Sequence, residues 1–255
     1  MTFSLDQIVV FLCILVRISA FIYTAPFFNL KNVPRKVKAG FSFAVALILF
    51  EVLPIQTLEY QGVIGYAGLV VKEALCGFIM GFFANVCSQI LTFAGQLVDM
   101  EIGFAMVNEF DPISNVQVTI TSNFYQYAVM LMLFITNMHH YIIMALVDSF
   151  QLIPVGTVVV NPSIYKAFLN FVINFFIIGF RIVLPVFATL LIVNTILAIL
   201  AKVAPQMNMF VIGMQLKVFV GLLVLLFMVA LIPSVSDFIF TEMIDMLKSA
   251  IAYLR

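Results

Sequence analysis

The stretch AFLNFVINFFIIGFRIVLPVFATLLIVNTILAILA, residues 167–201, is the longest apolar run in a chain of 255 residues. It is far longer than the roughly 20 residues that a helix needs to cross the hydrocarbon core of a membrane. Other apolar runs follow one another along the sequence. Helices and closed barrels are the structures that satisfy backbone polar groups in hydrocarbon, and barrel strands would alternate with a period of two. The runs therefore predict an all-α, integral-membrane-class protein of long bent helices and helical hairpins.

The composition excludes several classes of protein. Hydrophobic residues make up 64% of the chain and charged residues 9%, which leaves too little polar surface to cover a water-soluble globule. A net charge of zero offers nothing to nucleic acid. The spacing of Cys13, Cys76 and Cys87 matches no metal motif or disulfide framework, so we expect buried thiols and no cofactor. An acid and no base precede the first apolar run, so we expect a retained segment and not a signal peptide.

The first apolar run, residues 8–28, predicts the orientation of the chain. The next segment, NLKNVPRKVK at 29–38, contains four bases and no acid, so it is expected on the cytoplasmic side with the N-terminus on the other. Arg17 lies inside the run. A charge at this depth is costly and normally faces protein or a hydrated cavity, so we expect Arg17 to point at protein.

The next two runs differ in length. Residues 39–53 are short for a span, whereas 62–97 are long and are interrupted by Lys72 and Glu73. Gly77 and Gly81 form a small-xxx-small pair that permits close approach of another helix. A polar stripe within roughly 40° of one line follows in the same run: Asn85, Gln89, Thr92, Gln96 and Asp99. It predicts either a helix–helix seam or the lining of a hydrated passage, and both alternatives stay open.

The second half of the chain repeats this pattern. Lys166, Asn170, Asn174 and Arg181 share one face of the run 167–201, and Pro185 weakens the helix there. We expect a single bent helix and not a hairpin of two half-spans. A tight connection at 202–210 leads to the run 211–232. After Pro233, where Ser234 or Ser236 can act as cap, the pattern predicts an amphipathic helix at a membrane surface or against a partner.

Three segments interrupt the apolar pattern. Residues 99–123 contain four acids and no base, interleaved with Met and Phe, and so long a connection is usually a functional loop or a linker. Turn residues at 149–165 mark a boundary. The run 124–147 contains His139 and His140, which point about 100° apart on a helix. An intramembrane enzyme would rest on these two histidines alone, without a nucleophile or a set of metal ligands.

The motifs at these positions resemble those of the FliR/SctT family of type III secretion export gate subunits. The resemblance covers essentially the full length, in the family's order, and favours the flagellar branch. It rests on TAPFF and VPRKVKAG at 24–28 and 33–40, GFAM and DP at 103–106 and 111–112, and APQMN and FVIG at 204–208 and 210–213. One departure is VNEF at 107–110, which puts Asn108 and Glu109 where smaller or less acidic residues are expected.

The resemblance implies a function and a location. Such a protein is not an enzyme; it is a core subunit of the flagellar protein export gate, where it forms with FliP and FliQ a gated pore for unfolded flagellar proteins. It would lie in the bacterial inner membrane within the flagellar basal body, raised toward the periplasm and in contact with lipid. Residues 1–150 would be a FliP-like helical part, 151–165 a connector, and 166–255 a FliQ-like hairpin with an amphipathic C-terminal helix.

The resemblance also implies roles for individual residues. The central segment 99–123 would act as a plug in the pore, through Gly103, Phe104, Met106, Phe110, Asp111 and Pro112. The tip of the hairpin would face a FlhB-like subunit, through Ala204, Pro205, Gln206, Met207 and Asn208. We assign a further set to polar seams or the pore and not to lipid: Arg17, Asn85, Gln89, Gln96, Asp99, Asn170, Asn174 and Arg181.

The alternative from another class is a secondary transporter or channel subunit with broken helices. Pro185 and the apolar surroundings of Arg17 and Arg181 favour it. The two halves of the chain show neither an internal repeat nor a matching pair of interrupted spans, which speaks against it.

Overall fold

The computed structural model describes residues 5–29, 33–54, 58, 60–104 and 119–255. Within these ranges the regular structure is entirely helical, which confirms the all-α prediction. The helices are α1 (Leu5–Thr24), α2 (Arg35–Val52), α3 (Gly62–Ile102), α5 (Ile120–Ile135), α6 (Met138–Leu152), α7 (Ile164–Val203), α8 (Met209–Met228), the 3-10 helix η1 (Val229–Leu231) and α9 (Ile232–Tyr253).

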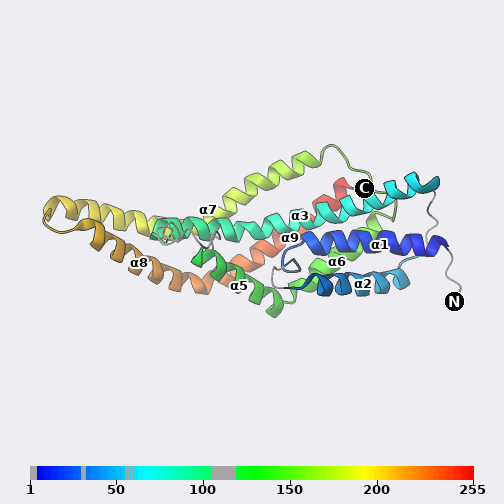
Figure 1. The fold of residues 1–255 in the computed structure, drawn as a ribbon. Helices are drawn as coiled ribbons and strands as arrows, with labels where there is room; N and C mark the ends of the chain where they lie inside the picture. The colour runs from blue at the N-terminus through cyan, green and yellow to red at the C-terminus, as the bar shows by residue number, and fades with distance from the viewer. Residues whose placement is uncertain (1–4, 30–32, 55–57, 59, 105–118) are drawn as a thin grey trace. The chain divides into compact units, whose positions relative to one another are not determined.

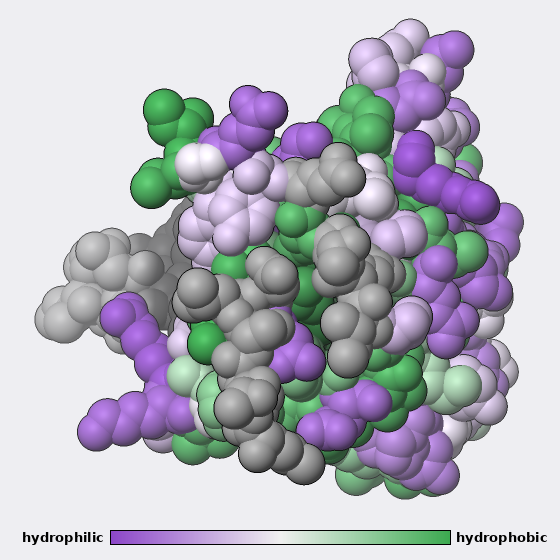
Figure 2. Space-filling view, turned by 90° about the vertical axis from the view of Figure 1, so that its right-hand side faces the viewer, coloured by the Kyte–Doolittle hydropathy of each residue, from purple (hydrophilic) through white to green (hydrophobic). Residues whose placement is uncertain are grey.

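Several helices are long and apolar enough to cross a membrane. Among the described residues these are Gln7–Thr24, Gly62–Ile102, Ile164–Val203 and Met209–Tyr253, with α5 and α6 together as a fifth, broken candidate. Large apolar side chains are exposed on their flanks, such as Phe227 at 75%. Figure 2 looks onto the end of the molecule where α1 begins and α2 ends, and much of that face is hydrophilic. Exposed apolar side chains along helices of this length are typical of membrane proteins.

The helices pack into two compact units. Unit 1 consists of Met1–Cys87, Asn137–Phe171 and Phe240–Arg255, and unit 2 of Ser88–Thr136 and Val172–Ile239. Three helices, α3, α7 and α9, contribute residues to both units. The division at 151–165 stays a prediction, since it concerns the ancestry of each part and not its packing.

The long run 167–201 forms a single helix, as expected. α7 continues unbroken from Ile164 to Val203 with Pro185 inside it. The amphipathic helix at the C-terminus is also present. The residues predicted for its polar face are exposed: Asp237, Thr241, Asp245, Lys248 and Arg255. Met243, Leu247 and Leu254 are buried, whereas Phe238, also predicted for the apolar side, is exposed. These three residues lie in the part of α9 that belongs to unit 1, so the chain itself covers that apolar face.

Two expectations about helix boundaries are wrong. The run 124–147 is not one helix, because α5 and α6 are separated at Asn137, whose φ of 56° is left-handed. Asn tolerates this conformation, and a single such residue leaves the apolar pattern intact. Ser234 and Ser236 are not caps, because α9 already begins at Ile232. Pro233 is tolerated in the first turn of a helix, where no intrahelical bond needs its missing N–H.

The packing of α1 on α3 depends on the two predicted glycines. A Cβ atom on Gly77 would collide with the carbonyl oxygen of Arg17, and one on Gly81 would collide with the Thr24 hydroxyl. Both contacts lie within unit 1. The small-xxx-small pair therefore brings the backbones of the two helices together, as predicted.

We expect Gly77→Ala to lower the free energy of unfolding by about 1–3 kcal/mol, because the α1 backbone cannot give way as a side chain can. Chemical unfolding of the purified protein in detergent measures this. Gly68→Ala is the matched control, since it lies on the same helix with open space where its Cβ would be. It should be neutral or stabilising by up to about 1 kcal/mol. Equal effects of the two substitutions would contradict the close approach.

Candidate functional site

A buried ion pair joins α1 to α3 in unit 1. Nε of Arg17 donates a hydrogen bond to Oε2 of Glu73 at 2.6 Å, and both side chains are completely buried. Arg17 therefore points at protein, as the sequence predicts. Removing two charges from water is expensive, and a buried pair is tolerated when its other polar atoms also find partners. The surroundings of each group therefore decide whether the pair is stable.

The end of α6 supplies partners for Arg17. Its Nη1 donates to the carbonyl oxygens of Ser149 and Ile153, at 3.3 and 3.0 Å. These carbonyls belong to the last turn and the C-cap of α6, where a helix leaves carbonyl groups unpaired and carries partial negative charge. The guanidinium also lies over the ring of Phe150, 4.2 Å from its centre. Arg17 thus caps α6 while it pairs with Glu73; its Nη2 is buried without a hydrogen bond to any described residue.

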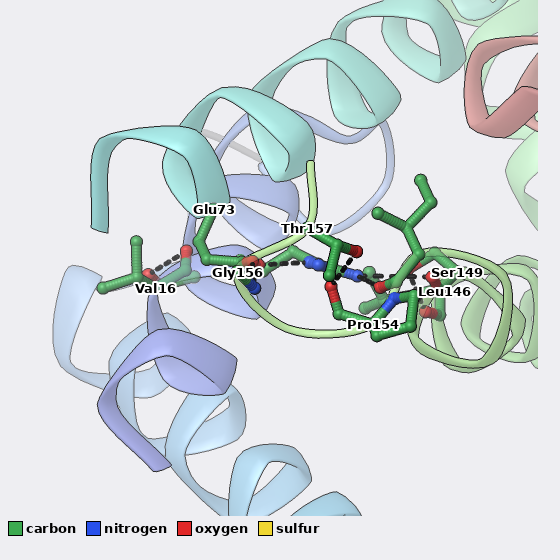
Figure 3. Close-up of polar contacts among 10 residues, drawn as sticks. Val16, Glu73, Leu146, Ser149, Pro154, Gly156 and Thr157 are labelled. Carbon is green, nitrogen blue, oxygen red and sulfur yellow. Dashed lines mark hydrogen bonds and ion pairs between the residues drawn. The ribbon is translucent and has the colours of Figure 1, made fainter. Parts of the chain in front are cut away.

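The connector after α6 supplies a partner for Glu73. Its Oε1 accepts a hydrogen bond from the backbone N–H of Gly156 at 2.7 Å, and Figure 3 shows Glu73 reaching this loop beside Pro154 and Thr157. The loop is held by a turn in which the Thr157 hydroxyl donates to the Pro154 carbonyl at 2.8 Å. Gly156 has a φ of +85°, which favours glycine. One ion pair therefore fixes α1, α3, α6 and the connector.

A second buried carboxylate joins α3 to α5 in unit 2. Oδ2 of Asp99 accepts a hydrogen bond from the backbone N–H of Thr121 at 3.1 Å, and Oδ1 accepts one from the Thr121 hydroxyl. The N-cap residue of α5, Thr119, makes no capping bond of its own to the helix. Asp99 therefore satisfies an N–H group that the first turn of α5 leaves unpaired, and its negative charge suits a helix N-terminus.

The seam between α3 and α5 contains further polar contacts. The Ser122 hydroxyl donates to the Thr92 carbonyl at 2.9 Å, and Nε2 of Gln126 donates to the Thr92 hydroxyl at 2.7 Å. A Cβ on Gly95 would collide with the backbone of Ser122, so the helices are close. Thr92 and Asp99 of the predicted stripe therefore lie in a seam within the chain.

The rest of the predicted polar positions are more accessible in the single chain. Asn85 and Asn174 are half-buried, and Gln89, Gln96, Asn170 and Arg181 are exposed. Their assignment to subunit seams or a pore stays a prediction.

The Asp99 contact brings together the two ends of the segment 105–118. α3 ends at Ile102, and Gly103 follows with a φ of +99°, its N–H donating to the Asp99 carbonyl at 3.1 Å. α5 begins at Ile120, next to the Thr121 that Asp99 holds. The described residues that flank the segment, at the end of α3 and the start of α5, are therefore held close together. Of the predicted plug residues, Gly103 and Phe104 are half-buried here, and Met106, Phe110, Asp111 and Pro112 lie outside the described residues.

The predicted hairpin tip is the turn between α7 and α8. The Met207 N–H donates to the Ala204 carbonyl at 3.2 Å, and the Asn208 side chain accepts from the Val211 N–H at the start of α8. Pro205, Gln206 and Met207 are exposed. The two arms run side by side from this turn (Figure 1), with Leu197 of α7 reaching the position of Gly213 of α8.

His139 and His140 lie next to each other at the start of α6. Their rings are tilted by 36° relative to each other, with centres 4.1 Å apart. In the described part of the chain, no group of three or more His, Cys, Asp or Glu side chains is placed to hold a metal ion.

Comparison with known proteins relates nearly the whole chain to one family. The family model described as bacterial export proteins, family 1, matches residues 8–243. The flagellar biosynthetic protein FliR of Bacillus subtilis (strain 168) is 31% identical over 97% of this chain and 96% of its own length. FliR of Buchnera aphidicola subsp. Schizaphis graminum is 32% identical over 94% and 91%, and FliR of Escherichia coli (strain K12) is 27% identical over 94% and 92%.

We expect Arg17→Met to lower the free energy of unfolding by about 3–5 kcal/mol, because it leaves the Glu73 carboxylate buried and unpaired. Chemical unfolding measures this, and Lys166→Met, at an exposed base in unit 1, should change little. Adding Glu73→Gln to Arg17→Met should restore part of the loss, with a coupling of about 0.5–3 kcal/mol. Additive effects would contradict the pairing.

We expect Asp99→Ala to loosen the first turn of α5 by about 1 kcal/mol, because it removes the acceptor for the Thr121 N–H. Hydrogen exchange at residues 120–124 measures this locally. Asp99→Asn keeps an oxygen acceptor and should lose less, and Glu101→Ala, which removes a carboxylate two residues further along α3, should leave exchange at α5 unchanged. Protection that survives Asp99→Ala would show that Asp99 is not the cap.

Proposed function

The chain belongs to the family of bacterial export proteins, family 1, and from that premise we propose that it is a core subunit of the flagellar type III protein export gate. It assembles with FliP- and FliQ-like subunits into a gated pore for unfolded flagellar proteins, and it catalyses no reaction itself. The observation that carries the proposal is the match of the family model and of the FliR relatives to nearly the full chain. Candidate spans of the required length support a membrane location.

The gate must pass an unfolded chain and exclude ions when it is closed. Methionine suits a seal of this kind because its side chain is flexible and adapts to varied surfaces. A phenylalanine constriction adds a barrier that excludes water. Met106 and Phe110 close the pore in this mechanism, and Gly103 and Pro112 position them.

The way in which the two ends of the plug segment are anchored supports this mechanism. Asp99 holds Thr121 beside the end of α3, so both ends of the segment 105–118 are anchored to a buried seam. A plug needs its two ends to be fixed close together. A segment with separated or loose ends would not return to one position after each exported protein has passed. The positive φ of Gly103 turns the chain away from the axis of α3 directly after the helix ends.

The remaining parts of the chain take roles that follow from the family. Residues 1–150 are the FliP-like part and 166–255 the FliQ-like hairpin, whose tip at 204–208 faces a FlhB-like subunit. The basic segment that leads into α2 faces the cytoplasm, with the N-terminus on the periplasmic side of the inner membrane. Polar residues exposed on the single chain, such as Gln89 and Gln96, lie in seams with other subunits or along the pore.

We expect deletion of residues 107–113 to raise small-ion conductance through the reconstituted gate, because it removes Phe110 and shortens the seal. Ion flux from vesicles that contain the assembled complex measures this. Met106→Ser with Phe110→Ser should also raise conductance. Asn108→Ser with Glu109→Ser is the matched control in the same segment and should not. Unchanged conductance in both the deletion and the Met106 and Phe110 variant would refute the plug and leave membership of the complex untouched.

A further inference from the structure

Unit 2 contains an apolar cavity of about 330 Å³ that is partly open to the outside. Its walls are formed by Leu91 of α3, Val129 of α5, Ile182 of α7 and Met228 at the end of α8. The volume lies within the usual range for small-molecule sites, which are mostly apolar and carry a few polar groups that fix orientation.

The polar groups of the cavity are few. Arg181 of α7 lines it and is exposed, and among the described residues no carboxylate forms an ion pair with it. Pro185, also in the lining, has no N–H to donate to the Arg181 carbonyl one turn earlier. Ser234 adds a hydroxyl group. The cavity therefore combines apolar walls with hydrogen-bonding groups and a cation that pairs with no carboxylate among the described residues.

The lengths of the two hairpin arms predict the depth of the cavity in a membrane. α8 contains 20 residues and is therefore ~30 Å long, which equals the thickness of a hydrocarbon core. The part of α7 from Pro185 to Val203 is ~28 Å long by the same rise per residue. Both arms start at the tip 204–208 and reach the cavity at their other ends, at Pro185 and Met228. If the arms span the bilayer, the cavity lies at the level of a membrane surface.

We propose that this cavity binds an anionic glycerophospholipid, with the phosphate at Arg181 and one acyl chain against the apolar walls. Lipid phosphates lie at the membrane surface, where a basic side chain attracts anionic lipid. The walls offer an acyl chain a mostly apolar surface, and the Tyr125 hydroxyl in the lining already donates to the Met228 sulfur. Arg181 thereby meets a lipid headgroup and not the hydrocarbon, which differs from its predicted place in a subunit seam or the pore. The inference goes beyond the proposed export function and does not depend on it.

Photocrosslinking of the unmodified full chain tests the site without any folding defect. The chain is reconstituted in phosphatidylcholine vesicles that contain phosphatidylglycerol with a photoreactive group near the end of one acyl chain. Crosslinks should concentrate on Leu91, Val129 and Ile182. Crosslinks that fall only on the exposed side chains of α8, such as Phe219 and Phe227, would overturn the inference. So would an absence of crosslinks in the cavity.

Lipid titration followed by native mass spectrometry tests the roles of charge and volume. The unmodified chain should bind phosphatidylglycerol about fivefold more tightly than phosphatidylcholine with the same acyl chains. Arg181→Gln should abolish this preference, and Lys202→Gln, a base at the other end of the same arm, should keep it. Val129→Trp should weaken the binding of both lipids. Equal binding of the two lipids by the unmodified chain, or displacement of the lipid by excess soluble glycerol phosphate, would overturn the inference.

Discussion

Arg17 and Glu73 form an ion pair that is sealed from solvent, and the packing of unit 1 is built around it. In a chain with 9% charged residues, each buried charge must find its partners inside the protein. The carbonyls at the end of α6 and the N–H of Gly156 complete the pair, so two side chains fix three helices and the connector. Removing either side chain would leave the other charge buried without its ionic partner, so the contacts of this pair depend on one another.

In unit 2, the buried carboxylate of Asp99 also finds its partners inside the protein. Asp99 is buried because the start of α5 offers it donors, and the result is a fixed base for the segment that follows α3. Anchored ends suit a gate, since the segment that moves must return to one position. The arms of α7 and α8 contrast with these two sites, because most of their exposed side chains are apolar. In the proposed assembly these side chains are covered by lipid or by other subunits.

The helices were largely predictable from the sequence because a long apolar run can adopt few structures other than a helix in a membrane. The continuity of α7 through Pro185, the inward orientation of Arg17 and the close approach at Gly77 and Gly81 follow from local patterns. The break at Asn137 was not predicted, since one left-handed residue does not disturb an apolar run. The partners were not predicted either: Glu73 lies 56 positions from Arg17, and helical periodicity carries no information at that distance. The stripe predicted that Asp99 avoids lipid, but not that it caps α5.

The central claim is that this chain works as one subunit of a mixed assembly. Native mass spectrometry of the chain purified together with FliP- and FliQ-like subunits tests this most directly, because it reports composition without assuming a mechanism. A stable complex that contains this chain and both other subunits is the predicted result. A lone or homodimeric species under the same conditions would contradict the claim and would favour a transporter or channel that works by itself.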